Sequence, residues 1–249
     1  MPQELLVRTL QIVRRHPWWA ARGKLAIDAL KREGIRPPAK IIDAGCGWGT
    51  NMDALEARGY QTTGLDISRQ ILQAIDRPER RLIEADLTQN LPAGAGNFDG
   101  LLALDVIEHL DDDRGAVRRF GELLRPGGIG IISVPARPDL FSEYDEIQGH
   151  RRRYVPETLR AVVTGSDLEI LRMFWWGQWM VPVLRRMRNK RTSSDSGKPA
   201  KTYAEYLRLP PWPGPLVMKF LYRWEHARAL NGTLETGTSL FAVVAKRQE

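Results

Sequence analysis

The sequence predicts an α/β fold built on a mostly parallel sheet with helices on both faces. Short apolar runs typical of strands alternate with helix-like runs through the first half of the chain, which is the pattern of repeated β-α-β units. The strand-like runs are 39–44, 60–66, 80–86, 98–104 and 129–135, and the helix-like runs are 50–58, 68–76 and 113–125. We therefore expect consecutive parallel strands with their carboxyl ends at one edge of the sheet.

Beyond residue 135 the alternation is looser but still interpretable. Residues 156–164 begin with proline, which suits the first turn of a helix. Residues 168–176 and 238–247 are apolar and predict two more strands. Residues 185–201 contain seven Lys or Arg and one Asp, so we expect a loop or linker there.

Size and composition fit one domain with additions. The chain has 249 residues, of which 43% are hydrophobic, enough for a packed core. We expect residues 1–38 to form an N-terminal helical cap in front of a main domain at 39–249. Within that domain, residues 177–236 are expected to form an insert that covers a substrate as a lid.

The net charge of +7 favours anionic partners such as phosphates, nucleic acid or a membrane surface, without selecting one. Cys46 is the only cysteine, so an intrachain disulfide is excluded and a cysteine-based zinc site is disfavoured. The first residues lack the pattern of a signal peptide, and no apolar run is long enough to span a membrane. We therefore expect a cytoplasmic protein.

A glycine-rich turn follows the first expected strand in IIDAGCGWGT (41–50). A dinucleotide site would place a third glycine where this chain has Thr50, and a phosphate-binding loop would need a lysine after the glycines. Neither pattern fits. Gly45 and Gly47 lack a Cβ, so a ligand can lie directly against the backbone of the turn.

An acidic residue stands at the end of each of three expected strands, at Asp43, Asp66 and Asp86. A carboxylate at Asp66 can accept hydrogen bonds from both hydroxyls of a ribose, and Asp86 can accept one from an exocyclic amine such as that of adenine. Each acid alone is explained as a helix cap or a loop residue. Three acids at one sheet edge indicate a nucleoside site.

These segments together resemble the successive motifs of class I S-adenosylmethionine-dependent methyltransferases: IIDAGCGWGTN, GLDIS, EADL, FDGLLALDVIEHL and LLRPGGIGIISVP. YDEIQGHRRRYVPETL (144–159) resembles a small-molecule and quinone-type subgroup. The resemblance implies a Rossmann-like, seven-stranded, mostly parallel sheet with an antiparallel last strand. It also implies methyltransferase activity with S-adenosyl-L-methionine as cofactor.

Carried over by position, the resemblance implies a set of cofactor-binding residues. They are Asp43, Gly45, Cys46, Gly47, Gly49, Asp66, Ile67, Asp86, Leu87, Leu104 and Asp105. In this assignment Asp66 binds the ribose, Asp86 and Leu87 hold the adenine edge, and Asp105 lies beside the sulfonium. Cys46 is expected to fill space in the turn rather than to act as a nucleophile.

The sequence limits the methyl acceptor without naming it. Amide and nucleobase N-methyltransferases of this class often carry Asn/Asp-Pro-Pro-Tyr after the fourth strand, where this chain reads LDVIEH. We therefore expect a small or lipid-like acceptor, methylated at oxygen or carbon, and no nucleic acid partner. The candidate catalytic residues are His109, His150, Glu108 and Tyr144, with His109 or His150 as the base.

Two features of the acceptor side have alternative interpretations. The cluster Arg151–Arg153 either holds an anionic acceptor or forms a solvated basic loop. Asp105, Glu108 and His109 have the i, i+3, i+4 spacing of one helical face, and with His150 they could ligate a divalent metal. That pattern resembles some quinone and RNA 3′-end methyltransferases. The simpler expectation is no metal, with Glu108 and His109 shaping the cofactor pocket.

The tryptophan-rich, basic insert is expected to act as a lid, and contact with a membrane surface is its alternative role. A cofactor-binding protein without turnover is the alternative from another functional class. A dehydrogenase is disfavoured by Thr50. The oligomeric state cannot be predicted from the sequence.

Overall fold

Seven strands form one mixed sheet in the computed structural model, which describes residues 3–92, 96–191 and 207–248. The strands are β1 Lys40–Ala44, β2 Gln61–Asp66, β3 Arg81–Glu84, β4 Phe98–Leu104, β5 Leu124–Pro135, β6 Leu168–Trp176 and β7 Ser239–Lys246. Their order is β3-β2-β1-β4-β5-β7-β6, and β7 runs antiparallel to both β5 and β6. This confirms the expected sheet, including its antiparallel last strand.

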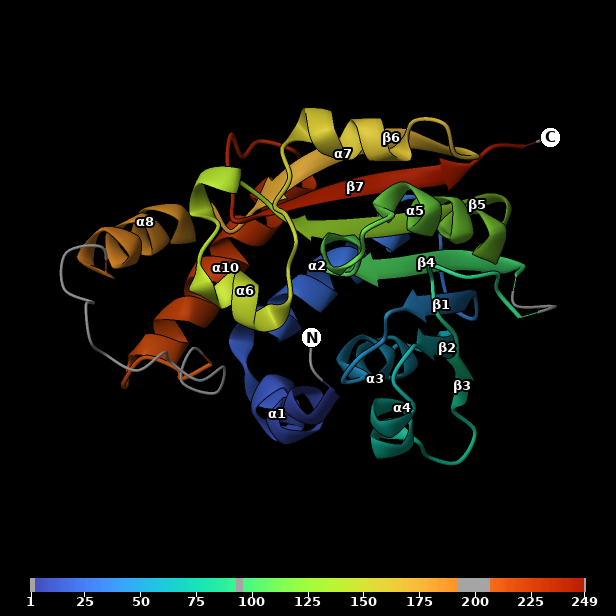
Figure 1. Cartoon of the computed structure of the whole chain (residues 1–249), viewed down its shortest axis with the longest axis horizontal. Coiled ribbons are helices and arrows are strands. Elements are labelled where there is room, and N and C mark those ends of the chain that lie inside the picture. The colour runs from blue at the N-terminus through green and yellow to red at the C-terminus, as the bar shows by residue number, and fades with distance from the viewer. Residues whose placement is uncertain (1–2, 93–95, 192–206, 249) are drawn as a thin grey trace.

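Helices cover both faces of the sheet (Figure 1). They are α1 Gln3–Arg15, α2 Pro17–Arg32, α3 Thr50–Glu56, α4 Arg69–Ile75, α5 Asp113–Leu123, α6 Glu143–Gln148, α7 Pro156–Val163, α8 Met180–Arg191 and α10 Gly214–Leu230. One apolar core lies between the sheet and α5 and α7, and the other between the sheet and α2 and α10. No helix within the described ranges is both long and apolar enough to cross a bilayer.

Local sequence signals explain where several helices begin. The Ser68 hydroxyl accepts a hydrogen bond from the Ile71 amide at 3.3 Å at the start of α4. The Asp112 carboxylate accepts one from the Gly115 amide at 2.8 Å at the start of α5. Each cap satisfies an amide that the helix itself leaves without a partner.

Most element boundaries differ from the sequence prediction by one or two residues, and three differences matter for the site or the expected loop. β3 ends at Glu84, so Asp86 lies in the turn after the strand instead of at its end. β5 begins at Leu124, which shortens the preceding helix. Helix α8 continues to Arg191 through the first part of the expected loop 185–201; the rest of that segment falls outside the described residues. Helix α8 starts before the basic run, and apolar residues spaced three positions apart, such as Val181 and Leu184, give its first turns a helical pattern.

The parallel strands end at one edge of the sheet, on the side toward which β4 and β5 point in Figure 1. The amino-terminal helices and the pair α8 and α10 lie at this same end of the molecule. Helix α2 packs against α10, so segments from opposite ends of the chain meet beside the strand ends.

The core at this end is rich in aromatic rings. Phe241 of β7 stacks on Phe174 of β6 with 5.1 Å between ring centroids, and it meets Trp176 edge-on. Trp176 in turn stacks on Tyr222 of α10 at 5.2 Å. These contacts join the antiparallel strand pair to α10.

Replacing Phe241 by alanine should lower the free energy of unfolding by about 3–5 kcal/mol, because the fully buried ring leaves a cavity among aromatic neighbours. Denaturant unfolding measures the change. Leu171→Ala, on the exposed side of β6, serves as the control and should change stability by less than about 0.5 kcal/mol. Equal effects of the two substitutions would contradict this description of the core.

Candidate active site

A cavity of about 1240 Å³ opens at the carboxyl ends of the parallel strands. Its wall includes the residues that end or follow four of these strands: Gly45, Asp66, Leu104 and Pro135. Small-molecule pockets usually measure roughly 300–1,000 Å³. This cavity is therefore large enough for a nucleoside-sized ligand together with a second molecule.

The glycine turn forms part of the cavity wall, as expected. The Gly45 and Cys46 amides donate to the Leu65 carbonyl at 2.7 and 2.9 Å, which fixes the turn against β2. Gly45 has φ of 76°, and a Cβ on it would meet Val106 Cγ2 at 2.7 Å. Both observations require glycine at this position, and they leave the bare backbone facing the cavity.

Asp66 connects this turn to the start of α4. Its Oδ2 accepts from the Gly47 amide and its Oδ1 from the Ser68 amide, each at 2.9 Å. Burial raises the pKa of Asp66, and the backbone hydrogen bonds oppose that rise. The adjoining Ile67 side chain is exposed and lines the cavity, where an adenine ring could pack against it.

Asp43 and Gly49 are not among the cavity-lining residues. Asp43 is buried behind the turn, where its Oδ1 accepts a hydrogen bond from the side-chain Nδ2 of Asn51 at 3.5 Å, and burial raises its pKa to about 7. Gly49 has φ of 68° and starts α3, where a Cβ would crowd Ile75. Both residues support the turn from behind, outside the cavity wall.

The other expected cofactor residues lie in the cavity wall. They are Cys46, Gly47, Asp86, Leu87, Leu104 and Asp105. Asp86 Oδ1 accepts from the amide and the hydroxyl of Thr88, each at 2.8 Å, so it also closes the turn that follows β3. Burial raises the pKa of Cys46 well above its usual value, which keeps it a thiol.

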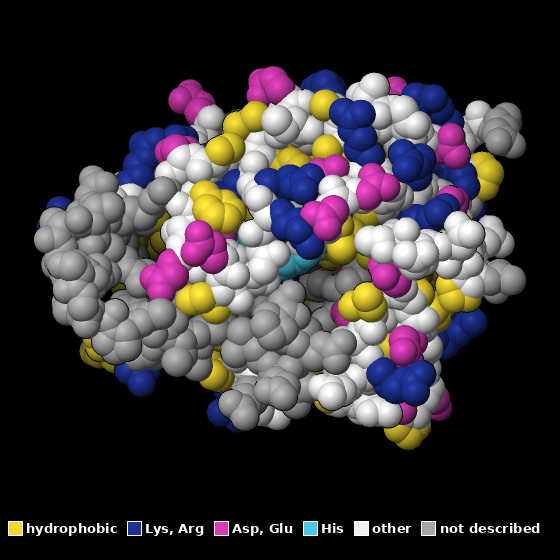
Figure 2. All heavy atoms as spheres, viewed as in Figure 1, with side chains coloured by type: hydrophobic (Ala, Val, Ile, Leu, Met, Phe, Trp, Pro, Cys, Tyr) yellow, Lys and Arg dark blue, Asp and Glu magenta, His cyan; other side chains and the backbone are white. Residues whose placement is uncertain are grey.

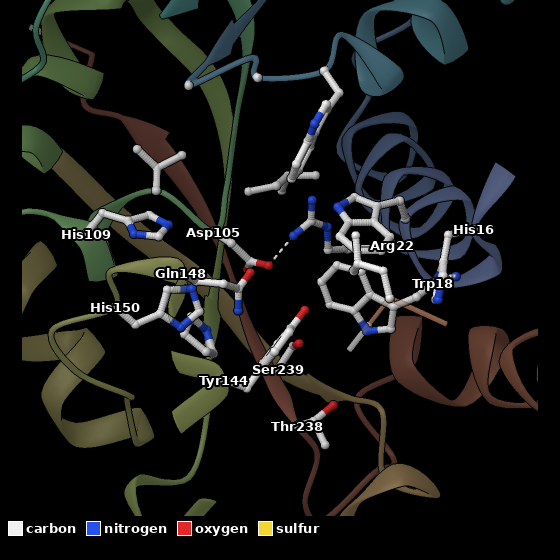
Figure 3. Close-up of a pocket in the computed structure, with 18 of the residues that line it drawn as sticks. His16, Trp18, Arg22, Asp105, His109, Tyr144, Gln148, His150, Thr238 and Ser239 are labelled. Atoms are coloured by element: carbon white, nitrogen blue, oxygen red, sulfur yellow. Dashed lines mark hydrogen bonds and ion pairs between the residues drawn. The ribbon is translucent and has the colours of Figure 1, made fainter. Parts of the chain in front are cut away.

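Arg22 of α2 was not predicted as a site residue, although it lies near the centre of the cavity (Figure 3). Its guanidinium is buried, forms an ion pair with Asp105 and lies over the Trp18 ring at 4.5 Å. Asp105 also accepts a hydrogen bond from the Ser133 hydroxyl at 3.0 Å. The available sequence signal was a charged residue directly after the apolar run PWWAA at the start of α2.

The backbone at Asp105 has φ of 57°, an unfavourable conformation for a residue with a side chain. It directs the chain out of β4 before the 3-10 turn Ile107–His109 begins. Asp105 consequently does not share one helical face with Glu108 and His109, contrary to the expectation from spacing. Its carboxylate pairs with Arg22 instead.

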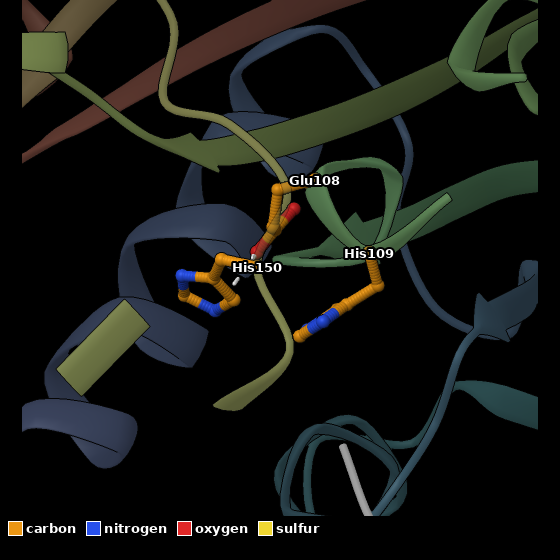
Figure 4. Close-up of side chains that lie close together, drawn as sticks. All are labelled: Glu108, His109 and His150. Carbon is orange, nitrogen blue, oxygen red and sulfur yellow. Dashed lines mark ion pairs between the residues drawn. The ribbon is translucent and has the colours of Figure 1, made fainter. Parts of the chain in front are cut away.

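Glu108, His109 and His150 do lie together, with one possible ligand atom from each within 4.8 Å of the others (Figure 4). The His150 Nε2 atom is 3.9 Å from Glu108 Oε1, and the two imidazole centroids are 4.7 Å apart. Glu108 is fully buried, and neither of its carboxylate oxygens has a hydrogen-bond partner. Burial and the nearby charge of Asp105 raise its pKa well above the usual value.

Hydrogen bonds set the orientation of both histidines. His109 Nδ1 lies 3.2 Å from the Gly149 carbonyl, and His150 Nδ1 lies 2.9 Å from Asp145 Oδ1. These acceptors favour the tautomer with the proton on Nδ1, in which Nε2 carries the lone pair. Burial, followed by the neighbouring His150, lowers the pKa of His109 to about 3, which keeps that ring neutral at pH 7.

Asp145 is the partner that holds His150. Although its burial acts to raise the pKa, hydrogen bonding from His150 and the charge of Arg153 lower it overall. The Arg153 guanidinium donates to both Asp145 oxygens, at 2.8 and 3.0 Å. The result is an ionised carboxylate that orients the imidazole.

Each arginine of the basic run Arg151–Arg153 forms an ion pair with an aspartate of the same chain. Arg151 pairs with Asp111, Arg152 with Asp113, and Arg153 with Asp145. Of the three arginines, Arg153 lines the cavity, and so does the fourth candidate catalytic residue, Tyr144. The ion pairs favour a structural role for this cluster over the holding of an anionic acceptor.

The side of the cavity next to α8 and α10 is largely apolar. Its apolar lining there includes Trp179, Met180, Val183, Leu184, Leu207, Met218 and Tyr222, and Arg208 adds one cationic side chain. The buried Glu225 of α10 accepts hydrogen bonds from the Gly177, Gln178 and Trp179 amides, between 2.7 and 3.3 Å. It thereby fixes the turn that carries Trp179.

Figure 2 shows a histidine side chain at the bottom of a hollow on one face of the molecule.

Comparison with known proteins identifies the family. A family model described as a methyltransferase domain matches residues 18–173. The chain belongs to this family. This confirms the family that the sequence motifs indicated, the class I S-adenosylmethionine-dependent methyltransferases.

A curated relative is the ubiquinone biosynthesis O-methyltransferase of Chromobacterium violaceum, 27% identical over 137 residues that cover 48% of this chain and 58% of the relative. The chain thus spans little more than half the length of the curated relatives it matches. A TehB-like S-adenosylmethionine-dependent methyltransferase from Corynebacterium glutamicum shares the fold, with TM-score 0.54 and 21% identity, over 91% of this chain and 88% of that one.

A second solved structure is the phosphoethanolamine N-methyltransferase 2 of Haemonchus contortus in complex with S-adenosyl-L-methionine. It has TM-score 0.53 and 17% identity, over 90% of this chain and 52% of that chain. At such identities the structural likeness establishes the fold.

Asp66→Asn should raise the dissociation constant for S-adenosylmethionine about tenfold or more, because an amide nitrogen would face the Gly47 or Ser68 amide and disturb the turn. Isothermal titration calorimetry measures the affinity. Asp99→Asn is the control, because Asp99 pairs with Arg125 at the opposite end of β4. An unchanged affinity in Asp66→Asn would remove Asp66 from the cofactor site.

Proposed function

We propose that the protein transfers a methyl group from S-adenosylmethionine to a hydroxyl group of a small or lipid-like acceptor, with His109 or His150 accepting the hydroxyl proton. The observation that carries this proposal is the pair of imidazoles in the cavity wall. Each has its Nδ1 engaged by an acceptor, which leaves the Nε2 lone pair available. A neutral imidazole with a free Nε2 can accept the proton, and the lowered pKa of His109 makes that ring the weaker base candidate.

The cavity residues suit the cofactor. The turn at Gly45 and Gly47 allows a ligand to approach the backbone, and Asp66 lies where it can accept hydrogen bonds from ribose hydroxyls. Ile67 and Leu87 offer apolar surface for adenine. Arg22 is a buried cation in the same cavity and suits the carboxylate of the cofactor's methionine part.

Bound S-adenosylmethionine supplies a methyl group on a positively charged sulfur, ready for in-line displacement. The protein then has to align the acceptor oxygen, remove its proton and exclude water. His109 and His150 can take the proton, and Asp145 holds the His150 ring in place. The apolar walls near Trp179 and Met218 reduce the access of water.

Oxygen is the acceptor atom we favour. The curated relative is named as an O-methyltransferase in ubiquinone biosynthesis, and the tetrad typical of nucleobase enzymes is missing from this chain. The apolar lining contributed by α8 and α10 suits an acceptor with a hydrophobic part.

A divalent cation held by Glu108, His109 and His150 is a second candidate, favoured by one observation. The two Glu108 oxygens are buried without hydrogen-bond partners and lie close to two imidazoles, an arrangement that a cation would satisfy. Such a cation would polarise the acceptor oxygen and lower its pKa. In this case the imidazoles act as ligands and not as bases.

His150→Gln should lower kcat roughly 10²–10⁴-fold while the affinity for S-adenosylmethionine stays unchanged, because the substitution removes the proton acceptor and spares the cofactor contacts. Transfer of a labelled methyl group to a panel of hydroxylated aromatic and lipid compounds measures it. His226→Gln is a matched control, since His226 also bonds an aspartate, Asp28, at 2.8 Å, but does not line the cavity. Full turnover in both His150→Gln and His109→Gln would refute base catalysis.

Under the second candidate, a chelator should reduce turnover at least about tenfold, and Mg²⁺, Mn²⁺ or Zn²⁺ should restore it. Added cation should also raise the melting temperature of the wild type but not of Glu108→Gln, a measurement that does not need the acceptor. Full activity in excess chelator would exclude the cation and leave the histidines as bases.

A further inference from the structure

Helix α10 carries apolar residues on two opposite faces. The inner face packs against the rest of the protein, and the outer face is exposed. Tyr222, Glu225 and Ala229 on the inner face are buried against the sheet and α2. The outer face exposes four large side chains: Leu216 at 54%, Val217 at 49%, Phe220 at 67% and Trp224 at 51%. Trp212, just before the helix, is 81% exposed. A surface helix normally places polar residues there.

The exposed residues form one stripe. At about 100° per residue, Leu216, Val217, Phe220 and Trp224 fall within one third of the helix circumference, opposite the buried face. Single exposed apolar residues are ordinary, but a continuous patch of this kind marks a binding surface.

Cationic residues flank this stripe. Lys219 and Arg223 lie along one side of it and Arg228 along the other, and all three are exposed. The Arg228 guanidinium lies over the Trp224 ring at 4.8 Å. The one acidic residue in α10 is Glu225, which is buried and bonded to the turn at 177–179. The exposed face is therefore apolar and positively charged, without an acidic side chain.

We propose that this outer face of α10, together with Trp212, is a membrane-binding surface for bilayers that contain anionic lipid. An exposed helix face with tryptophan among its apolar residues and Lys or Arg at its margins suits the interface between headgroups and acyl chains. Tryptophan favours this region because its ring is apolar and its N–H needs a polar partner.

Charge decides between a membrane and a second copy of the chain. A two-fold contact through this face would bring the same patch of both copies together, and with it Lys219, Arg223 and Arg228 of each. Like charges without acidic partners oppose such a contact, whereas anionic headgroups complement it.

The position of the surface relates it to the cavity. Met218 and Tyr222 of the same helix line the apolar side of the cavity, and α10 lies at the end of the molecule where the strands finish. A bilayer bound to the outer face would thus lie next to the apolar side of the cavity. The inference rests on the surface residues and holds whichever acceptor is methylated.

Co-sedimentation with vesicles tests this surface. The wild type should bind vesicles of phosphatidylcholine with phosphatidylglycerol at least about tenfold more strongly than pure phosphatidylcholine, and added salt should weaken binding. Phe220→Ser with Trp224→Ser, and separately Lys219→Glu with Arg223→Glu, should each weaken binding about tenfold or more. Leu171→Ser is the control: it removes an exposed apolar residue from β6 and should leave binding unchanged.

All these substitutions are at exposed positions, and an unchanged melting temperature verifies the fold. Absence of vesicle binding by the wild type, or undiminished binding in both double variants, would refute the proposal. Light scattering provides a separate check. A dimer that Phe220→Ser and Trp224→Ser convert to monomers would identify the face as a subunit interface instead. Retained methyl transfer without vesicle binding would overturn this inference and leave the proposed function standing.

Discussion

The buried ion pair between Arg22 and Asp105 is the contact on which the arrangement of the site depends. Asp105 follows β4 in a left-handed conformation, accepts a hydrogen bond from Ser133 of β5, and pairs with a guanidinium from α2. Removing one member would leave the other charge buried and uncompensated, which is strongly unfavourable. The pair therefore holds the N-terminal helices over the strand ends and closes one side of the cavity.

A second set of polar contacts orders the opposite side. Arg153 and His150 both bond Asp145, and this network holds the His150 ring close to Glu108 and His109. The carboxylate of Asp145 is satisfied, whereas the carboxylate of Glu108 is not. These two buried acids thus have different roles. Asp145 orients an imidazole, whereas the carboxyl group of Glu108 needs either a proton or a bound cation to offset its burial.

Helix α10 links this site to the outside of the molecule. Its inner face supplies Tyr222 to the cavity and Glu225 to the turn that positions Trp179, while its outer face exposes Phe220 and Trp224. One helix thereby shapes the apolar side of the cavity and presents an apolar, cationic surface. The apolar wall of the cavity and the proposed membrane surface are therefore on opposite faces of the same helix.

The sequence by itself determined the sheet, the glycine turn and the acids near the strand ends, because these depend on local periodicity and on backbone conformations that glycine permits. The cofactor and the family followed from the order of these motifs. Arg22 and Glu225 were not identified as site residues, because their partners, Asp105 and the turn at 177–179, lie far away in the chain. The approach of His150 to Glu108, the pairing of Arg151–Arg153 and the two faces of α10 were likewise decided by tertiary structure, because burial and charge pairing depend on which distant segments meet.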